Sequence, residues 1–286
     1  MAEVEATSCF TPPQMLEKTS AIGVTKSSLR LLPLLLLAIL AGMYIAFGGV
    51  FSTVIATGTN TVLPYGIVKL LQGLVFSLGL ILVVVGGAEL FTGNMLMIIP
   101  FLERKIRFNS LLRNWLVVYI GNLVGSLIVA LLIISAGSYR LAGGLLGTTM
   151  LSIADSKMHY SFLQAISLGI LCNILVCLAV WLSYSARNTT DKILSIIFPI
   201  SAFIAAGFEH SVANMYLIPV ALLLKNIDPG FVAGSGLNLS ALSWGDFFLH
   251  NLLPVTLGNM VGGIIFVGIA YYLAYHRNDL NNDSKQ

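Results

Sequence analysis

The chain has 286 residues, of which 57% are hydrophobic and only 9% are charged, and its mean hydropathy is +0.91. Soluble domains carry roughly a quarter charged residues, and disordered chains combine low hydrophobicity with high net charge, so both classes are excluded. The formal net charge of +3 is spread along the chain and does not form the basic patch that binds nucleic acid. The composition therefore indicates a protein whose partner is the lipid bilayer.

The polar N-terminal segment, residues 1–26, lacks the continuous apolar core of a cleaved secretory signal. We expect it to remain as a cytoplasmic segment, followed by a six-helix transmembrane domain at 27–276 and a short cytoplasmic tail at 277–286. Of the three cysteines, Cys9 lies in this segment, and Cys172 and Cys177 lie in an apolar run. They are typical of neither a disulfide framework nor a metal site, and no metal or other cofactor is expected.

Six charge-poor apolar runs are long enough to cross a membrane, because about 20 helical residues span a hydrocarbon core. They lie near residues 31–56, 67–100, 115–136, 161–184, 193–224 and 249–275. Because the number of spans is even, both chain ends lie on the same side of the membrane. Eleven of the fifteen Lys and Arg residues flank the spans on that side, and the four on the other side are Lys69, Arg140, Lys157 and Lys225. Because cytoplasmic flanks are enriched in Lys and Arg, we predict a multi-pass protein of the cell inner (plasma) membrane with both termini in the cytoplasm.

Two of the runs, 67–100 and 193–224, are too long for one straight helix across the membrane. They would measure about 51 Å and about 48 Å at 1.5 Å per residue, against a hydrocarbon core about 30 Å thick. Each is interrupted by glycine and polar residues at a comparable place, residues 86–94 in the first and 207–214 in the second. We therefore predict that both helices are broken within or near the membrane.

The two interrupted segments share a pattern. In GAELFTGNMLMIIP (87–100) and GFEHSVANMYLIP (207–219), the Gly, the Glu two places later and the Asn-Met pair coincide, and a phrase Gly-Asn-x-Val-Gly follows each, at 121–125 and 258–262. Each unit has three spans, so the second must lie upside down relative to the first, as in many transport proteins. We predict an all-α membrane protein of six helices in two inverted three-helix repeats, with helices 2 and 5 broken. The glycines of the shared phrase are expected to let helices pack closely.

The breaks indicate a pathway, because irregular backbone at membrane depth is tolerated only inside protein or beside a wet cavity. They also create helix starts, which favour anions. His210 is the strongest candidate, since an ionisable group within a membrane is functional by default and imidazole changes charge near neutral pH. Two interpretations of Glu89 and Glu209 remain open: they line the pathway, or they only accept hydrogen bonds from the broken backbone.

Large apolar side chains near the breaks can close a narrow pore to hydrated ions. Phe76 and Leu80 lie four residues apart on one face of the second span, Leu90 and Phe91 lie in its break, and Phe203 precedes the second break. For any single one of them, packing against lipid or protein is the more common explanation.

Five segments carry the most specific patterns of the chain. They are Gly-Ala-Glu-Leu-Phe-Thr-Gly at 87–93, Asn-Trp at 114–115 with Gly-Asn at 121–122, Ala-Asp-Ser-Lys-Met-His at 154–159, Asn173 with Val-Cys-Leu-Ala-Val-Trp at 176–181, and Gly-Phe-Glu-His-Ser-Val-Ala-Asn-Met at 207–215. Through them the sequence resembles the formate/nitrite transporter family, particularly its formate channel branch, over about residues 15–275. The resemblance implies an aquaporin-like fold assembled as a homopentamer with one pore in each protomer.

The resemblance also implies roles for individual residues. Thr92 and its loop would gate the pore, and His210 would contact the permeating anion or pass it a proton. Glu209 and Asn173 would support the histidine, and Lys157 would draw anions into a vestibule. The implied hydrophobic constrictions consist of Phe76 and Phe203 on the outer side and of Leu80, Leu90, Phe91 and Val176 on the inner side.

Formate is the predicted permeant. A carboxylate with a pKa around 4 is ionised at pH 7, and its charge crosses apolar rings at high cost, so a proton from His210 would lower the barrier. The Glu-Leu-Phe-Thr-Gly phrase also resembles nitrite channels, whereas the stretch from Asp155 to His159 is closer to formate channels, so nitrite and hydrosulfide remain alternatives. An intramembrane enzyme would need a nucleophile or metal motif that the spans lack, and a water or glycerol channel would need paired Asn-Pro-Ala segments.

Overall fold

The computed structural model describes residues 9–59 and 62–283, with the backbone alone for 277–283. Part of the expected N-terminal segment, residues 1–8, and the last residues of the expected tail, 284–286, lie outside the described residues. In the described part of the chain every regular element is a helix, which confirms the predicted all-α class.

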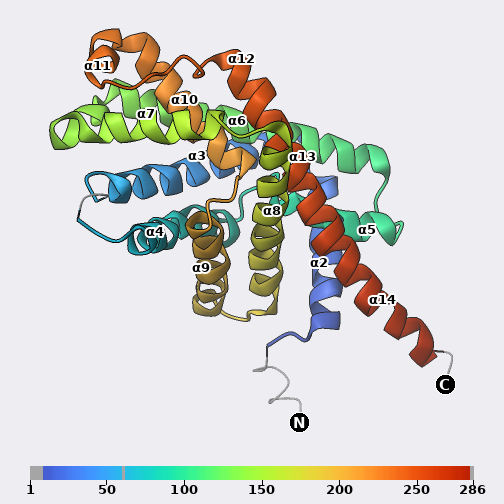
Figure 1. Ribbon diagram of the computed structural model, residues 1–286. Helices are drawn as coiled ribbons and strands as arrows, with labels where there is room; N and C mark the ends of the chain where they lie inside the picture. Colours follow the sequence, from blue (N-terminus) through green and yellow to red (C-terminus); the bar gives the residue numbers. More distant parts are fainter. Residues whose placement is uncertain (1–8, 60–61, 284–286) are drawn as a thin grey trace.

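The elements follow one another in two series. The first comprises α2 (Pro12–Ser28), α3 (Leu31–Ala56), α4 (Tyr65–Gly86), η1 (Gly93–Met97), α5 (Ile98–Leu102), α6 (Phe108–Ser135), η2 (Ser138–Gly144) and α7 (Leu145–Met158). The second comprises α8 (Phe162–Ser185), α9 (Thr189–Ala205), α10 (Ser211–Ile227), α11 (Pro229–Gly234), α12 (Trp244–Asp246), η3 (Phe247–Leu252), α13 (Leu253–Val261), η4 (Gly262–Ile269) and α14 (Ala270–Asp283). Figure 1 shows their arrangement.

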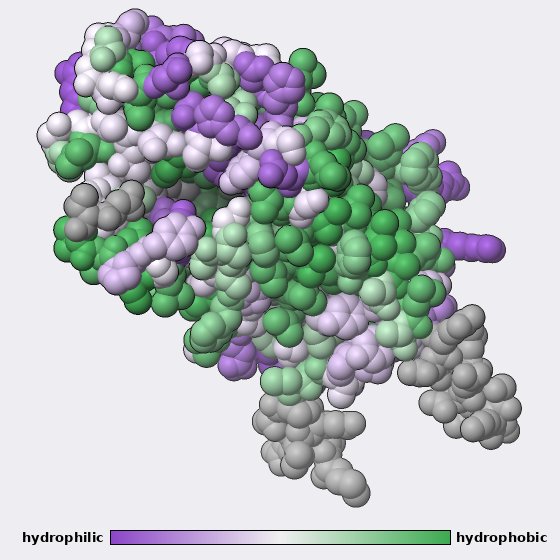
Figure 2. Space-filling view, in the orientation of Figure 1, coloured by the Kyte–Doolittle hydropathy of each residue, from purple (hydrophilic) through white to green (hydrophobic). Residues whose placement is uncertain are grey.

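Among the described residues, five helices are long and apolar enough to cross a membrane. They are Leu31–Ala56, Tyr65–Gly86, Phe108–Ser135, Phe162–Ser185 and the continuous rod Trp244–His276. The remaining expected span is divided into α9 and α10, which are joined through residues 206–210. Figure 2 shows apolar residues over a broad band across the middle of the molecule and hydrophilic residues gathered at its upper end. An apolar surface of this extent is what lipid contact requires.

Both predicted helix breaks are present. α4 ends at Gly86, and α9 ends at Ala205. Each break contains a glycine in the left-handed region, Gly87 with φ +77° and Gly207 with φ +72°. That conformation is inexpensive only for glycine, so these two residues let the chain leave its helix and turn toward the centre of the protein.

The helices pack as two similar halves. In the first, α3 packs against α4 and α6; in the second, α8 packs against α9 and α13. The glycines of the repeated phrase lie at these contacts, as expected. A Cβ at Gly125 would collide with the carbonyl of Ile39, and one at Gly262 with that of Ile170. The close approach brings α6 and α13 near enough to the breaks for their side chains to reach the irregular backbone.

Helix α2 is part of the packed structure rather than a separate tail. It contacts η1, α5, α8 and α14, and its Met15 and Leu16 form a buried cluster with Ile99 and Trp181. It also continues past the expected boundary at residue 26, to Ser28. α2 and α14 lie at the lower end of Figure 1, opposite α11 and α12, so the first and last described helices share one side of the protein.

Candidate functional site

One asparagine from α6 stabilises the first break. Asn122 Oδ1 accepts a hydrogen bond of 2.9 Å from the backbone N–H of Phe91. Its Nδ2 donates to the carbonyls of Ala38, at 2.8 Å, and Glu89, at 2.9 Å. Asn122 is fully buried. It therefore provides the partners that backbone groups within a membrane need when no helix pairs them.

The carboxylate of Glu89 is held by side chains. Lys26 Nζ lies 3.0 Å from Glu89 Oε1, and Asn94 Nδ2 donates to Glu89 Oε2 over 2.7 Å. Asn94 also accepts from Lys26 Nζ, at 2.8 Å, and donates to Asn114 Oδ1, at 2.9 Å. Both carboxylate oxygens of Glu89 and the ammonium group of Lys26 thus have partners.

The second break has the same plan. Asn259 from α13 accepts from the backbone N–H of Ser211, at 2.8 Å, and donates to the carbonyls of Gly169, at 2.8 Å, and Glu209, at 3.0 Å. Lys157 Nζ lies 2.6 Å from Glu209 Oε1. The repeat detected in the sequence is therefore a repeat of contacts.

The correspondence between the two breaks extends to the asparagines that bind each glutamate. Asn214 donates to Glu209 Oε2, at 2.7 Å, and to Asn251 Oδ1, at 2.8 Å, as Asn94 does in the first half. Asn251 in turn donates to the carbonyl of Lys157, at 3.0 Å. The two glutamates accept from lysine and asparagine side chains, whereas the asparagines at 122 and 259 serve the backbone.

Asn122, Asn259 and the Lys26–Glu89 ion pair were not expected from the sequence to be parts of the site. The signal was available, because the asparagine is the polar member of each Gly-Asn-x-Val-Gly phrase. Its glycines were interpreted through helix packing, and the amide between them was not considered as a partner for a distant backbone.

Replacing these asparagines tests their role. We expect Asn122→Ala and Asn259→Ala each to lower the free energy of unfolding by about 2–6 kcal/mol. A buried polar group left unpaired costs about 1–3 kcal/mol, and each variant leaves two backbone groups of a break unpaired, Phe91 N–H and Glu89 C=O or Ser211 N–H and Glu209 C=O. Thermal unfolding in detergent measures the loss. The exposed Asn238 is the matched control, and a loss as large in Asn238→Ala would contradict this account.

The two breaks meet at Thr92 and His210. Thr92 Oγ1 lies 2.8 Å from His210 Nε2, and both residues are buried. His210 is also the N-cap of α10, where its Nδ1 accepts a hydrogen bond of 3.1 Å from the backbone N–H of Ala213. Since Nδ1 accepts, it carries no proton, and the ring proton lies on Nε2 and points toward Thr92. The structure therefore places a neutral imidazole at the start of a helix, where an anion is favoured.

The side-chain amide of Asn173 donates to two backbone carbonyls. Its Nδ2 donates to the carbonyl of Thr92, at 3.2 Å, and to that of Asn259, at 2.7 Å. Cys177 Sγ also donates to the carbonyl of Thr92, at 3.4 Å. These two α8 residues hold the first break against the second half of the protein. Within the Thr92–His210 pair, they bind the threonine backbone.

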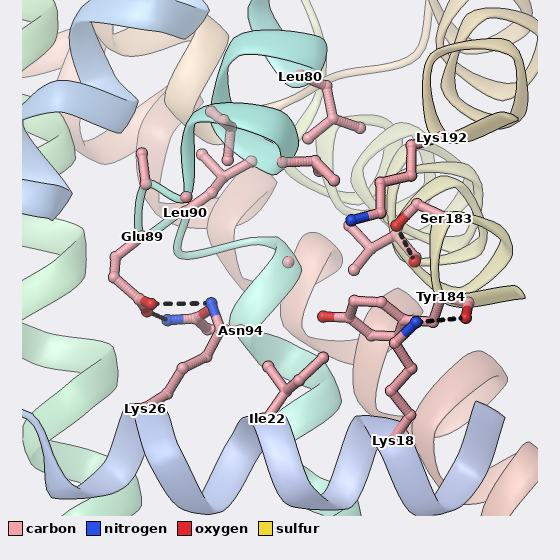
Figure 3. Close-up of a pocket in the computed structure, with 16 residues that line it drawn as sticks. Lys18, Ile22, Lys26, Leu80, Glu89, Leu90, Asn94, Ser183, Tyr184 and Lys192 are labelled. Carbon is pink, nitrogen blue, oxygen red and sulfur yellow. Dashed lines mark hydrogen bonds and ion pairs between the residues drawn. The ribbon is translucent and has the colours of Figure 1, made fainter. Parts of the chain in front are cut away.

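Two cavities lie beside the breaks; the one next to Glu209 is called the outer cavity and the one next to Glu89 the inner cavity, as names only. The outer one has a volume of about 140 Å³, and its lining includes Phe76, Lys157 and Glu209. The inner one, of about 240 Å³, is lined by Leu80, Leu90, Glu89 and residues of α2. Figure 3 shows Lys18 and Lys26 rising from α2 into the inner cavity.

Buried apolar side chains separate the two cavities. Phe76, Leu80 and Leu90 are each 2% exposed and Phe203 is 1% exposed, and the rings of Phe76 and Phe203 meet edge to face with centroids 5.7 Å apart. The ring of Phe203 also lies 5.9 Å from that of His210. His210 is itself only 3% exposed, so its imidazole lies in a buried setting with the Phe203 ring on one side.

Phe91 and Val176, the other two residues expected at the inner constriction, line neither the outer nor the inner cavity. The ring of Phe91 packs on Tyr119, with centroids 4.8 Å apart, and borders a groove beside α6, η3 and α13. Val176 is buried on α8. The backbone turn after Glu89 directs Leu90 and Phe91 to opposite sides, which their adjacency in the sequence permits but does not specify.

Residues 13–273 match the model of the formate/nitrite transporter family. This chain belongs to that family. Members of the formate/nitrite transporter family are channels and transporters, which excludes the intramembrane enzyme considered from the sequence. The chain is accordingly a multi-pass membrane protein.

Several relatives within the family are similar to this chain over most of their length. Formate channel FocA of Escherichia coli strain K12 is 43% identical over 272 residues, which cover 94% of this chain and 95% of FocA. A probable formate transporter of Methanothermobacter thermautotrophicus is 39% identical, covering 92% and 96% of the two chains. A solved pentameric formate channel with formate bound has a TM-score of 0.78 at 46% identity, covering 86% of this chain and 97% of that one.

Proposed function

We propose that this protein is a formate channel that assembles as a homopentamer with one pore in each protomer. The observation that carries the proposal is the meeting of two broken helices at a buried histidine between two lysine-bearing cavities. The similarity to FocA and to a pentameric channel with formate bound supports both the permeant and the assembly.

The proposed pathway runs from the outer cavity to the inner one past His210. Phe76 and Phe203 close it on the outer side, and Leu80 and Leu90 close it on the inner side. The ring contact of Phe76 with Phe203 supports the outer closure, and the place of Leu80 and Leu90 in the lining of the inner cavity supports the inner one. The roles of Phe91 and Val176 at the inner constriction stay predictions. Anion passage requires the Thr92–His210 contact to open, because the permeant must reach the Nε2 proton that now points at the threonine.

Histidine acts on the permeant in two ways. The neutral ring donates its Nε2–H to a formate oxygen, which replaces part of the lost hydration. At lower pH an imidazolium can give this proton to formate, so that formic acid leaves and the neutral ring remains. Protonation adds a hydrogen at Nδ1, which faces the backbone N–H of Ala213. Proton transfer therefore requires the first turn of α10 to move.

We assign the end of the protein that carries α2 and α14 to the cytoplasm and the protein to the cell inner membrane. The distribution of Lys and Arg along the sequence supports this orientation. In this arrangement residues 1–26 and 277–286 are cytoplasmic and 27–276 form the channel domain. The inner cavity faces the cytoplasm, and Lys157 lies on the outer side.

Uptake of radiolabelled formate into proteoliposomes, at two pH values and with nitrite or hydrosulfide as competitor, tests the function. We expect formate uptake well above that of protein-free liposomes, with weaker inhibition by either competitor than by unlabelled formate. Faster uptake of nitrite, or formate uptake equal to that of protein-free liposomes, would reject formate as the main permeant.

A further inference from the structure

The charges that line the outer cavity are not balanced. Among the residues that the structure describes there, three are charged: Lys69, Lys157 and Glu209. Lys157 and Glu209 form a buried ion pair with a separation of 2.6 Å. To an anion that approaches from the cavity, this pair presents little net charge, since the positive and negative groups nearly coincide. Lys69 supplies the remaining positive charge.

Lys69 stands where an incoming anion would pass before it reaches Lys157. A second cavity, of about 520 Å³, adjoins the outer cavity, and Lys69, Gln72, Ile153 and Ser156 line both. Lys69 is the one charged residue of the second cavity within the described chain. Its Nζ lies 5.7 Å from the centre of the Tyr65 ring, and no ion pair involves it among the described residues.

The inner cavity repeats this arrangement. Its charged lining residues in the described part of the chain are Lys18, Lys26, Lys192 and Glu89. Lys26 is paired with Glu89 at 3.0 Å. Lys18 Nζ donates to the carbonyl of Tyr184, at 2.9 Å. Because a carbonyl is neutral, it does not cancel the positive charge of Lys18. Figure 3 shows Lys192 entering the cavity opposite α2.

We propose that Lys69 in the outer cavity, and Lys18 with Lys192 in the inner cavity, provide the positive potential that concentrates small monovalent anions at the pore. The ion-paired Lys157 and Lys26 are positioning residues: each holds the glutamate of a helix break. This inference deepens the proposed function and rests on it. A cavity wall of low dielectric strengthens the field of each unbalanced charge and raises the local anion concentration.

The local potential can be measured without transport. Ser156→Cys introduces a reporter thiol on the wall shared by the outer cavity and the second cavity. The background variant is Cys9→Ser; the remaining Cys172 and Cys177 are buried and stay unreactive. The readout is the ratio of modification rates by an anionic sulfonate and a cationic trimethylammonium thiosulfonate reagent at low ionic strength. We expect Lys69→Met to lower this ratio by about threefold or more, because a unit charge within a Debye length attracts anions and repels cations.

The controls separate local from overall charge. Lys69→Arg keeps the charge and should keep the ratio. Arg140→Gln removes an exposed cation from the same side of the protein, outside these cavities, and should also leave the ratio unchanged. Lys69→Gln is a second neutral variant should Lys69→Met fold poorly. An unchanged ratio in both neutral variants would overturn the proposal.

Flux measurements give a second readout. Lys69→Met should raise the half-saturating formate concentration by several-fold at low ionic strength, leave the maximal rate unchanged, and match the parent protein at high ionic strength. A shifted thiol ratio in a protein that does not conduct formate would uphold the charge assignment and reject the proposed permeant. An unshifted ratio rejects the charge assignment whatever the permeant is.

Discussion

His210→Phe is expected to reduce formate flux by about ten- to a hundredfold and to remove its pH dependence. A hydrogen bond to a charged group contributes about 1.5–3 kcal/mol, which corresponds to roughly that factor in rate. Phenylalanine keeps much of the ring volume between the cavities but lacks the Nε2 donor and any group that can carry a proton. Radiolabelled formate uptake into proteoliposomes, measured from acidic to neutral pH, provides the test.

The substitution also removes the N-cap of α10, so a control must separate capping from contact with the anion. Asparagine is a strong N-cap residue, and His210→Asn keeps an acceptor for the N–H of Ala213 while it removes the titratable ring. We expect His210→Asn to preserve thermal stability and still to lose the pH dependence of flux. Unchanged flux with unchanged pH dependence in His210→Phe would reject the role of the histidine.

Lys157→Met is expected to lower the free energy of unfolding by about 3–5 kcal/mol, because the loss of one partner leaves a buried charge uncompensated. The Glu209 side chain is 2% exposed and the Lys157 side chain 15% exposed. Once the lysine is gone, the Glu209 carboxylate remains in an apolar setting with Asn214 as its side-chain donor. Thermal unfolding in detergent, together with the yield of assembled protein, measures the effect.

A double variant distinguishes the pair from either residue. In Lys157→Met with Glu209→Gln, the buried charge disappears and the amide oxygen can still accept from Asn214, so most of the lost stability should return. Lys105→Met provides the matched control, since Lys105 forms an ion pair at 2.9 Å with Glu103 but its side chain is 54% exposed; such pairs contribute about 0–1 kcal/mol. Equal losses in Lys157→Met and Lys105→Met would contradict the assigned burial effect.

The sequence patterns predicted the family, the all-α fold and the breaks, but they did not specify which side chains contact each other. Asn173 was expected to support His210, and it donates to the carbonyl of Thr92, whose hydroxyl contacts the histidine; the sequence did not specify that partner. Phe91 was grouped with Leu90, yet its ring lies against Tyr119. In both cases the sequence predicts where the residue lies along a helix or break. It does not predict which neighbouring side chain or carbonyl the residue contacts.

The N-terminal segment shows the same difference between pattern and packing. Its polar composition placed it outside the membrane, and residues 12–28 form α2 at the end of the protein that also carries α14. Composition did not reveal that Lys26 reaches Glu89 or that Met15 and Leu16 join a buried cluster. These contacts link residues far apart in the sequence, and no local periodicity reports them.

By itself, the sequence determined that this chain spans a membrane, that two of its spans are interrupted and that its halves are related, because hydropathy, helix length and repeated phrases are local properties of the chain. Only the tertiary structure decided which charges remain unbalanced, that a neutral His210 meets Thr92, and that the asparagines of α6 and α13 pair the broken backbone. Each of these depends on distances of about 3 Å between side chains from different helices, which the close packing of the two halves sets.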